Sequence, residues 1–138
     1  MRVKVIALVL ALLLPGIAVQ AEDKRRAGIV DVIEAQLEAF QRDDGSAAFG
    51  FATRDIKAML GRPADILKMV VEAYHPVYRP RAVTYLDLIQ ENVSLVQRVL
   101  FTKPDDKQVL AFYMMARQPD ITWRIAGCVL IELTGKAA

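Results

Sequence analysis

Residues 75–80, with the sequence HPVYRP, divide the chain into two halves with different hydrophobic periods. Before this stretch, apolar residues recur every three or four positions, as they do along one side of an amphipathic helix. After it, short apolar runs are separated by polar turns, a pattern typical of antiparallel strands joined as hairpins. Helices followed by strands predict an α+β domain, with the helices packed on one face of the sheet.

His75, the single histidine of the chain, lies in this stretch. Because proline disfavours helical geometry in the residue before it, Pro76 and Pro80 predict extended backbone at His75 and Arg79. A histidine can serve as a general base or a metal ligand, but the sequence offers no second histidine and no zinc-binding spacing. We therefore expect His75 to have a structural position at the end of the last helix.

Four helical segments are predicted before this stretch, at residues 24–42, 46–51, 53–60 and 63–74. Gly45 is expected to cap the first segment in a left-handed conformation. Ser46 and Thr53 are suitable N-terminal caps for the second and third segments. Pro63 fits the first position of the fourth, where its missing N–H is not needed.

Four strands are predicted after it, at residues 83–88, 93–101, 109–116 and 123–131. Proline-containing turns at residues 103–106 and 118–121 join the last three strands. Strict alternation in the last strand places Trp123, Ile125, Val129 and Ile131 on one face and Arg124, Cys128 and Glu132 on the other.

The first 21 residues have the composition of a secretory signal peptide: a basic start, an apolar run at residues 5–14 and small residues before a cleavage site after Ala21. We therefore expect a signal peptide at residues 1–21 and a single α+β domain at residues 22–138, located in the periplasm or secreted. An uncleaved membrane anchor is the alternative. The uncharged run that supports it, residues 5–21, has 17 residues and is near the short limit for a spanning helix.

Removal of residues 1–21 leaves 117 residues with 16 basic and 16 acidic side chains, so the expected domain is formally neutral. Neutrality argues against a nucleic-acid partner and against electrostatic binding to anionic lipid. Membrane contact is expected only through the signal segment before cleavage. Cys128 is the single cysteine, so no intramolecular disulfide can form. Its apolar neighbours favour an inert core thiol, and a reactive or intermolecular thiol is the alternative.

Short pieces spread from the first helix to the last strand carry a family resemblance. They are Gln36-Leu37, Ala39-Phe40, Pro76-Val77-Tyr78-Arg79-Pro80, Gln97-Arg98-Val99, Gln118-Pro119-Asp120, Trp123-Arg124-Ile125 and Gly127-Cys128. Together they resemble a secreted proteobacterial family, the domain of unknown function 4864, within the cystatin-like or nuclear-transport-factor-like α+β superfamily. One departure is Ile121, where the resemblance implies a glycine; type I turn geometry tolerates other residues there.

The resemblance implies N-terminal helices packed on a curved four-stranded antiparallel sheet, export from the cytoplasm, and no established reaction. The wider superfamily forms a pocket between sheet and helices. Some of its members are isomerases or hydrolases, some bind small molecules, and many dimerise through the sheet. A fold shared by so many activities does not by itself select one of them.

The sequence carries no phosphate-binding loop, nucleophile elbow or zinc signature, so neither a cofactor nor a metal is expected. Polar side chains beside or within the strands are the candidate ligand contacts: Tyr78, Arg79, Tyr85, Asp87, Arg98, Tyr113 and Arg124. Tyrosine and arginine at a pocket mouth can hold a carboxylate or enolate oxygen. Alternatively, Tyr78 packs on the core while Arg79 pairs with a carboxylate. Likewise, Arg98 and Arg124 either join a cross-strand ion-pair ladder or converge on an anion.

Three functions follow as hypotheses. The first is a non-catalytic module that binds a small molecule or a protein through the pocket or the open sheet face. The second is a pocket enzyme of the isomerase or hydrolase type that uses Asp87, Tyr85, Tyr113 or Arg98. The third is a structural envelope protein that forms a homodimer through the sheet. The sequence favours binding over catalysis, because no titratable group has a recognisable orienting partner.

Overall fold

The computed structural model describes residues 15–133, with side chains from residue 20 onward. The first half forms helices α1 (Pro15–Gln41), α2 (Gly45–Gly50), α3 (Arg54–Leu60), α4 (Pro63–Ala73) and α5 (His75–Tyr78). The second half forms strands β1 (Ala82–Glu91), β2 (Ser94–Thr102), β3 (Gln108–Arg117) and β4 (Trp123–Glu132). The strands make one antiparallel sheet in the order β1-β2-β3-β4. The predicted α+β class and the position of the helices before the sheet are therefore confirmed.

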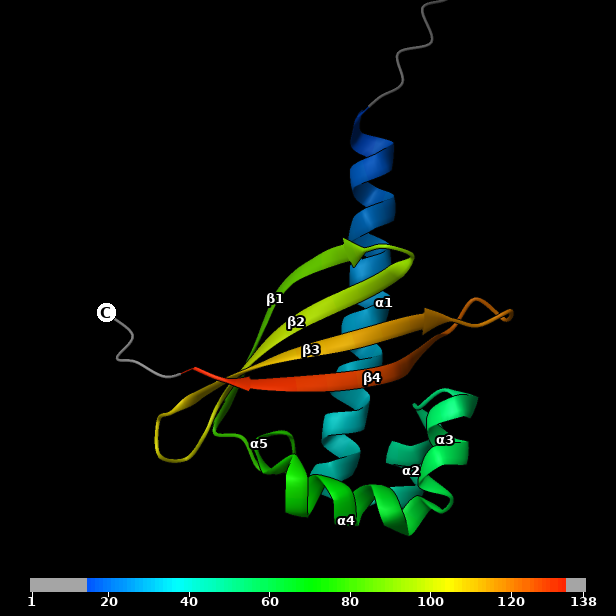
Figure 1. Ribbon diagram of the computed structural model, residues 1–138. Helices are drawn as coiled ribbons and strands as arrows, with labels where there is room; N and C mark the ends of the chain where they lie inside the picture. Colours follow the sequence, from blue (N-terminus) through cyan, green and yellow to red (C-terminus); the bar gives the residue numbers. More distant parts are fainter. Residues whose placement is uncertain (1–14, 134–138) are drawn as a thin grey trace, which may run out of the picture.

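The long helix α1 passes behind the sheet, and the shorter helices lie together near the C-terminal end of α1, at the bottom of Figure 1. Ile29, Ile33 and Phe40 recur at helical spacing on the side of α1 that faces the sheet, and each is at most 1% exposed. They pack in the same core as Val99 and Phe101 of β2. Burial of a side chain of this size contributes about 1.5–3 kcal/mol, so the packing of α1 against the sheet supplies much of the free energy of folding.

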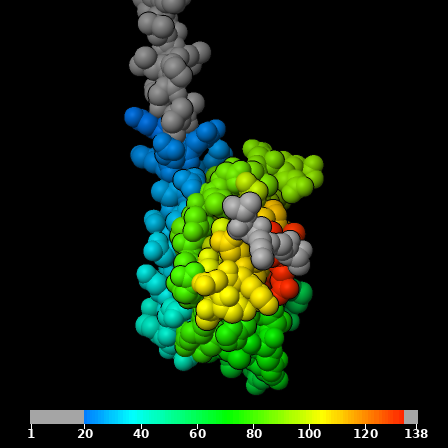
Figure 2. Space-filling model, turned by 90° about the vertical axis from the view of Figure 1, so that its left-hand side faces the viewer, coloured from blue at the N-terminus to red at the C-terminus, as the bar shows by residue number. Residues whose placement is uncertain are grey.

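Helix α1 begins at Pro15 and continues through Ala21, so both sides of the predicted cleavage site lie in one helix. Its N-terminal turns extend past the sheet (Figures 1 and 2). Residues 1–14, which carry most of the predicted signal peptide, lie outside the described residues. Within the described part of the chain, no helix is long and apolar enough to cross a membrane. Cleavage after Ala21 stays a prediction.

Two predicted roles near the end of α1 are wrong. Asp43, not Gly45, takes the left-handed conformation, with φ of 54°. Gly45 instead begins α2, and a Cβ there would lie 2.9 Å from the Pro63 carbonyl oxygen. Glycine is therefore needed for the close approach of α2 and α4. The cap of α2 is Asp44, whose side chain accepts from Ala47 N (3.0 Å), rather than Ser46. The predicted roles of Thr53 and Pro63 at the starts of α3 and α4 are confirmed.

The joint that separates the two halves is more helical than predicted. Tyr74 ends α4 with φ of −128° and ψ of 38°, and its carbonyl accepts from Val77 N (2.8 Å). The next four residues form the single turn α5, so the prediction of extended backbone at His75 is wrong. Pro76 is tolerated because the first turn of a helix needs no N–H donor there.

A β-bulge in β4 overturns the predicted faces for the part of the strand after it, whereas Trp123 and Ile125 share one face as predicted. The pairing with β3 shifts between Gly127, opposite Met114, and Ile125, opposite Met115, which leaves Ala126 as an extra residue. An added residue reverses the alternation of side chains beyond it. Cys128 therefore shares the helix-facing side with Ile125, and Val129 lies on the outer face, where it is 49% exposed.

The two proline-containing turns have the same geometry. In residues 103–107 and 118–122, the first residue donates its N–H to the carbonyl of the last, each at 2.8 Å. The fourth residue of each turn is left-handed, with φ of 68° at Asp106 and 64° at Ile121. The hairpin between β3 and β4 forms despite isoleucine at this position, but the expected reason, a type I conformation that suits any residue, is wrong, because a β-branched residue is strongly disfavoured in the left-handed region.

Candidate functional site

A cavity of about 250 Å³ lies between the sheet and the helices. Its walls come from α1, α3, α4, the joint between α4 and α5, and strands β3 and β4. The chain between α2 and α3 is tied to the edge of β4 by two backbone hydrogen bonds. Ile125 N donates to the Phe51 carbonyl (2.8 Å), and Thr53 N donates to the Ile125 carbonyl (3.0 Å). These bonds place the start of α3 against the sheet edge and complete the cavity wall.

The wall of this cavity is apolar, with Phe40, Ile66 and Val77 among its side chains. Within the part of the chain that the structure describes, no Asp, Glu, Lys, Arg or His lines it. The amide of Gln36 does line it, but its Nε2 donates to the Ala48 carbonyl (3.1 Å) and so ties α1 to α2. A charged ligand would lose its hydration here without gaining a counter-charge, so the wall favours neutral molecules.

Tyr113 supplies the unsatisfied polar group of the wall. It is 1% exposed, and its hydroxyl meets no hydrogen-bond partner of good geometry in residues 20–133. Its polar neighbour is the Cys128 thiol, which is only a weak donor and acceptor. Burial raises the pKa of Tyr113 well above the ordinary value, so the hydroxyl stays protonated and can donate at neutral pH. An unpaired buried polar group costs roughly 1–3 kcal/mol, which a ligand with an acceptor atom at this position would recover.

Cys128 stands directly opposite Tyr113 in the pairing of β3 with β4 and lines the same cavity. Burial raises the pKa of its thiol to about 12. The thiol is therefore protonated at neutral pH, and a protonated thiol is a poor nucleophile. This favours the inert interpretation of Cys128 over the reactive one.

Gln97 is the neighbour of Tyr113 on the other side, on β2, and is completely buried. Its Nε2 donates to the carbonyls of Leu86 and Arg98, both at 2.9 Å. Leu86 lies in the bulge of β1, whose pairing with β2 shifts between Tyr85 and Leu88. Gln97 thus satisfies a carbonyl that the bulge removes from the ladder, while its Oε1 finds no partner in the described chain.

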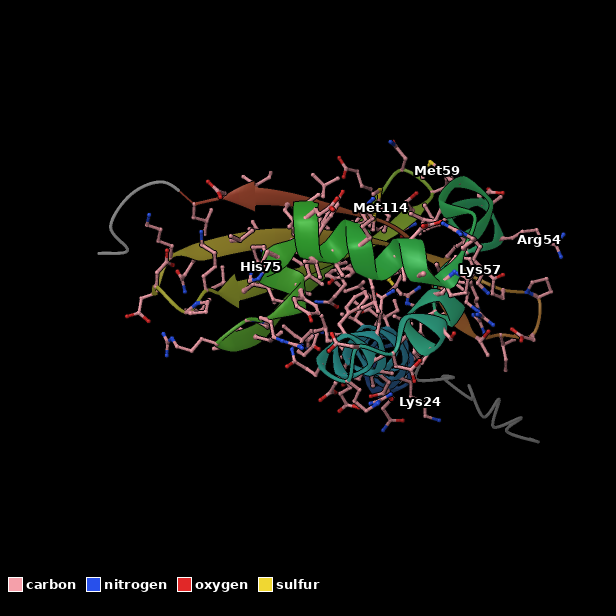
Figure 3. The ribbon with its side chains drawn as sticks, turned by 90° about the horizontal axis from the view of Figure 1, so that it is seen from below. Lys24, Arg54, Lys57, Met59, His75 and Met114 are labelled. Atoms are coloured by element: carbon pink, nitrogen blue, oxygen red, sulfur yellow. The ribbon has the colours of Figure 1, made fainter. Side chains whose placement is uncertain are left out.

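The mouth of the cavity lies at the edge of β4, beside α3. Met59 of α3 lines the cavity and is nevertheless 75% exposed, so it marks the opening. Met114 lies across Gly127, because a Cβ on Gly127 would be 2.5 Å from the Met114 Cε. Figure 3 shows Met59 and Met114 near each other, whereas His75 lies at the far end of α4. The absence of a side chain at Gly127 therefore gives Met114 its path to the cavity.

Tyr78 and Arg79 form a cluster with Asp43 outside the cavity. The Tyr78 hydroxyl donates to the Asp43 carboxylate, which raises the pKa of Tyr78. The Arg79 guanidinium lies 4.0 Å from the Tyr78 ring centroid, donates to the Phe40 carbonyl (3.1 Å) and approaches Asp43 (3.4 Å). These contacts fasten the joint to the end of α1, and they correspond to the predicted alternative in which Arg79 pairs with a carboxylate.

Asp87 and Arg98 pair with each other on the outer side of the sheet. The Arg98 Nη2 lies 2.5 Å from the Asp87 carboxylate, and this hydrogen-bonded pairing lowers the pKa of Asp87. Arg124 instead donates to the carbonyl of Gly50. Arg98 and Arg124 stand opposite Phe112 and Ala116 of β3, roughly 14 Å apart along the strands. The structure therefore does not bring the two arginines to one point.

Of the seven candidate contacts, Tyr113 is the one that lines the cavity in the described chain. Tyr85 is half-buried on β1, and burial, reinforced by Glu34 and Glu38, raises its pKa to about 12. It lies outside the cavity lining. Whether the other candidates contact a ligand stays a prediction.

Sequence reasoning missed several lining residues. Gln36 could have been identified from the sequence, because a polar residue on the buried side of an amphipathic helix implies a hydrogen-bond partner in the interior. No sequence pattern indicated a ligand contact at Met59, Met69 or Met114, since methionine among apolar residues is typical of core packing.

The arrangement suits binding better than acid–base catalysis. Three titratable side chains line the cavity, Tyr74, Tyr113 and Cys128, and the two that are deeply buried, Tyr113 and Cys128, have raised pKa values and keep their protons at neutral pH. Within residues 15–133, no cluster of three or more His, Cys, Asp or Glu side chains is placed to hold a metal ion. The cavity can therefore enclose a small neutral molecule and offer it the buried Tyr113 hydroxyl as a donor.

Comparison with known proteins gives a family and nothing finer. Searches of the curated proteins and of the solved structures each returned no match. Residues 22–138 match a family described as "Domain of unknown function (DUF4864)". That match spans the four-stranded sheet and every helix after α1, together with the cavity between them. The chain therefore belongs to the DUF4864 family of domains of unknown function.

Proposed function

We propose that this chain is a non-catalytic, exported domain that binds a small neutral molecule in the cavity between sheet and helices. The observation that carries the proposal is the Tyr113 hydroxyl, which is buried, protonated and without a partner of good geometry in a mainly apolar wall. Natural proteins pair nearly all buried polar groups, so an unpaired one on a side chain that lines a cavity supports the presence of a partner there.

The size of the cavity limits that partner. A cavity of about 150 Å³ lined by apolar side chains is large enough to bind benzene. The cavity here, at about 250 Å³, accommodates a ring or short chain with a few additional atoms. Because its lining is uncharged, neutral molecules are favoured over carboxylates, phosphates and amines.

A thermal-shift comparison of matched neutral and charged molecules tests the proposal. Benzyl alcohol, benzoate and benzylamine share a ring and differ in charge, and only the neutral member is expected to raise the Tm. Tyr113→Phe is expected to reduce that shift, because it removes the hydroxyl donor. Tyr85→Phe is the matched control, since Tyr85 lies outside the cavity lining. Equal shifts in the two variants, or a larger shift with the charged molecules, would contradict the proposal.

Export is a separate part of the proposal. It is supported by the basic and apolar leader, and by a family match that begins at residue 22, directly after the predicted cleavage site. Mass spectrometry of the protein from its native cell should find an N-terminus at Glu22 in the periplasm or medium. A protein retained in the cytoplasm with residues 1–21 intact would contradict export.

The homodimer through the sheet stays a prediction, with one favourable observation. Leu100 and Leu110 are register partners on the outer face of the sheet, next to Phe112, and Val129 and Ile131 beside them are 49% and 48% exposed. An apolar face of this kind is a common site of association. Light scattering during gel filtration should give twice the monomer mass if the prediction holds, and Val129→Lys should then restore the monomer.

A further inference from the structure

We propose that the ligand of this cavity is aromatic: a single neutral ring with one hydrogen-bonding group, held against methionine thioethers. This inference rests on the proposed binding function and specifies its ligand class. Its starting point is the distribution of sulfur. In the described part of the chain, four of the five sulfur-containing side chains line this one cavity: Met59, Met69, Met114 and Cys128. Met115, the fifth, is buried in the core and does not line the cavity, although it stands opposite Ile125, which does.

Thioether sulfur distinguishes an aromatic ligand from a saturated one. Methionine sulfur makes favourable contacts at the edge of aromatic rings, at a separation of about 5 Å, and the unbranched side chain adapts to the ring it meets. Leucine or isoleucine walls of equal volume would bury an alkyl group equally well and would give no such preference. Three methionines around about 250 Å³ therefore favour a ring over a saturated group of the same size.

The gradient of burial sets the orientation of the ligand. Tyr113, at 1% exposure, is at the closed end, and Met59, at 75% exposure, is at the mouth. The hydrogen-bonding group is expected at the Tyr113 hydroxyl, because that hydroxyl has no partner of good geometry in residues 20–133 and its neighbour, the Cys128 thiol, is a weak one. The ring then lies toward Met59 and Met114, whose side chains Figure 3 shows near each other. A substituent opposite the polar group would point out of the mouth.

The test compares p-cresol with 4-methylcyclohexanol, which have the same heavy-atom skeleton and differ in aromaticity. The protein is labelled with ¹³C at the methionine methyl groups, so each methyl reports its own contact with a ring. We expect p-cresol to bind about five- to tenfold more tightly, from the sulfur–aromatic contacts. The largest ring-current shifts are expected at Met59, Met69 and Met114, and a smaller shift at Met115, which is outside the lining but beside it.

A variant separates thioether chemistry from shape. Replacement of Met59, Met69 and Met114 together by leucine keeps the volume of the wall nearly constant. It is expected to abolish the preference for p-cresol while leaving the binding of 4-methylcyclohexanol within about twofold. If the triple variant does not fold, Met59→Leu alone serves, since that side chain is mostly exposed.

The outcomes distinguish the inference from the function on which it rests. Equal affinity for the two compounds, with shifts at the cavity methionines, overturns the aromatic preference and keeps a neutral-ligand site. Binding that shifts only Met115 places the ring elsewhere and overturns the inference. No binding of either compound, together with no thermal shift from benzyl alcohol, overturns the proposed function itself.

Discussion

Replacement of Ile121 by glycine is expected to stabilise the protein, although it removes a large apolar side chain. Ile121 has φ of 64°, the left-handed region in which an L side chain costs about 1–2 kcal/mol. It is 70% exposed, so little buried area is lost with the side chain. Glycine removes the penalty but gains unfolded-state entropy worth roughly 0.5–1 kcal/mol. The net gain in the free energy of unfolding is therefore centred on about 0.7 kcal/mol, within a range of about 0–1.5 kcal/mol.

Urea denaturation of matched variants measures this gain. Ile121→Val keeps the β-branch and should leave the midpoint unchanged, whereas Ile121→Asn should recover part of the gain, since asparagine tolerates this region. Asp106→Gly, in the equivalent turn, should gain less, because aspartate is already tolerated there. A glycine variant that is no more stable than the valine variant would refute the assignment of strain to this turn.

Three further changes follow from the packing and the titrating groups. Gly45→Ala should lower the free energy of unfolding by about 1–3 kcal/mol, because its Cβ would lie 2.9 Å from the Pro63 carbonyl oxygen. Gly50→Ala is the control, since open space surrounds Gly50, and it should be neutral or stabilising. Chemical denaturation compares the two variants. Tyr113→Phe should leave the ligand-free protein as stable or about 1 kcal/mol more stable, because it removes an unpaired buried hydroxyl, and a loss above 1 kcal/mol would mean that the hydroxyl has a partner. The pKa of Cys128 is about 12 in the folded protein, above that of a thiol in the unfolded chain. The free energy of unfolding is therefore unaffected by this group below about pH 8.5, and it falls by about 1.4 kcal/mol per pH unit as the pH rises from there toward 12. The difference between the urea midpoints at about pH 8 and about pH 10 should be smaller in Cys128→Ala than in the wild type.

The fold was predictable because its two hydrophobic periods are distinct. Residues on the buried side of α1, such as Ile29 and Ile33, recur at helical spacing, and the strands are separated by proline-containing turns. The faces of β4 were not predictable in the same way. The bulge leaves Ala126 unpaired within a run of small and apolar residues, in which either alternation fits the sequence.

The cavity was predictable only in outline. Tyr113 could be nominated because a polar residue inside a strand needs a partner, but the lining depends on how α3 meets β4. That contact uses the backbone groups of Phe51, Thr53 and Ile125, which any sequence carries. Tyr78 and Arg79 drew attention through their residue types, and the structure places them in a cluster with Asp43 that fastens the joint.

The most direct test of the central claim, that the Tyr113 hydroxyl anchors a ligand, is a cycle of four dissociation constants: p-cresol and toluene, each with the wild type and with Tyr113→Phe. Toluene has no polar atom for the hydroxyl, so its affinity is expected to change less than about twofold. One hydrogen bond contributes about 1 kcal/mol, so p-cresol should weaken about fivefold. Equal effects on the two compounds, or no effect on either, would contradict the claim that this buried hydroxyl is the binding group of the cavity.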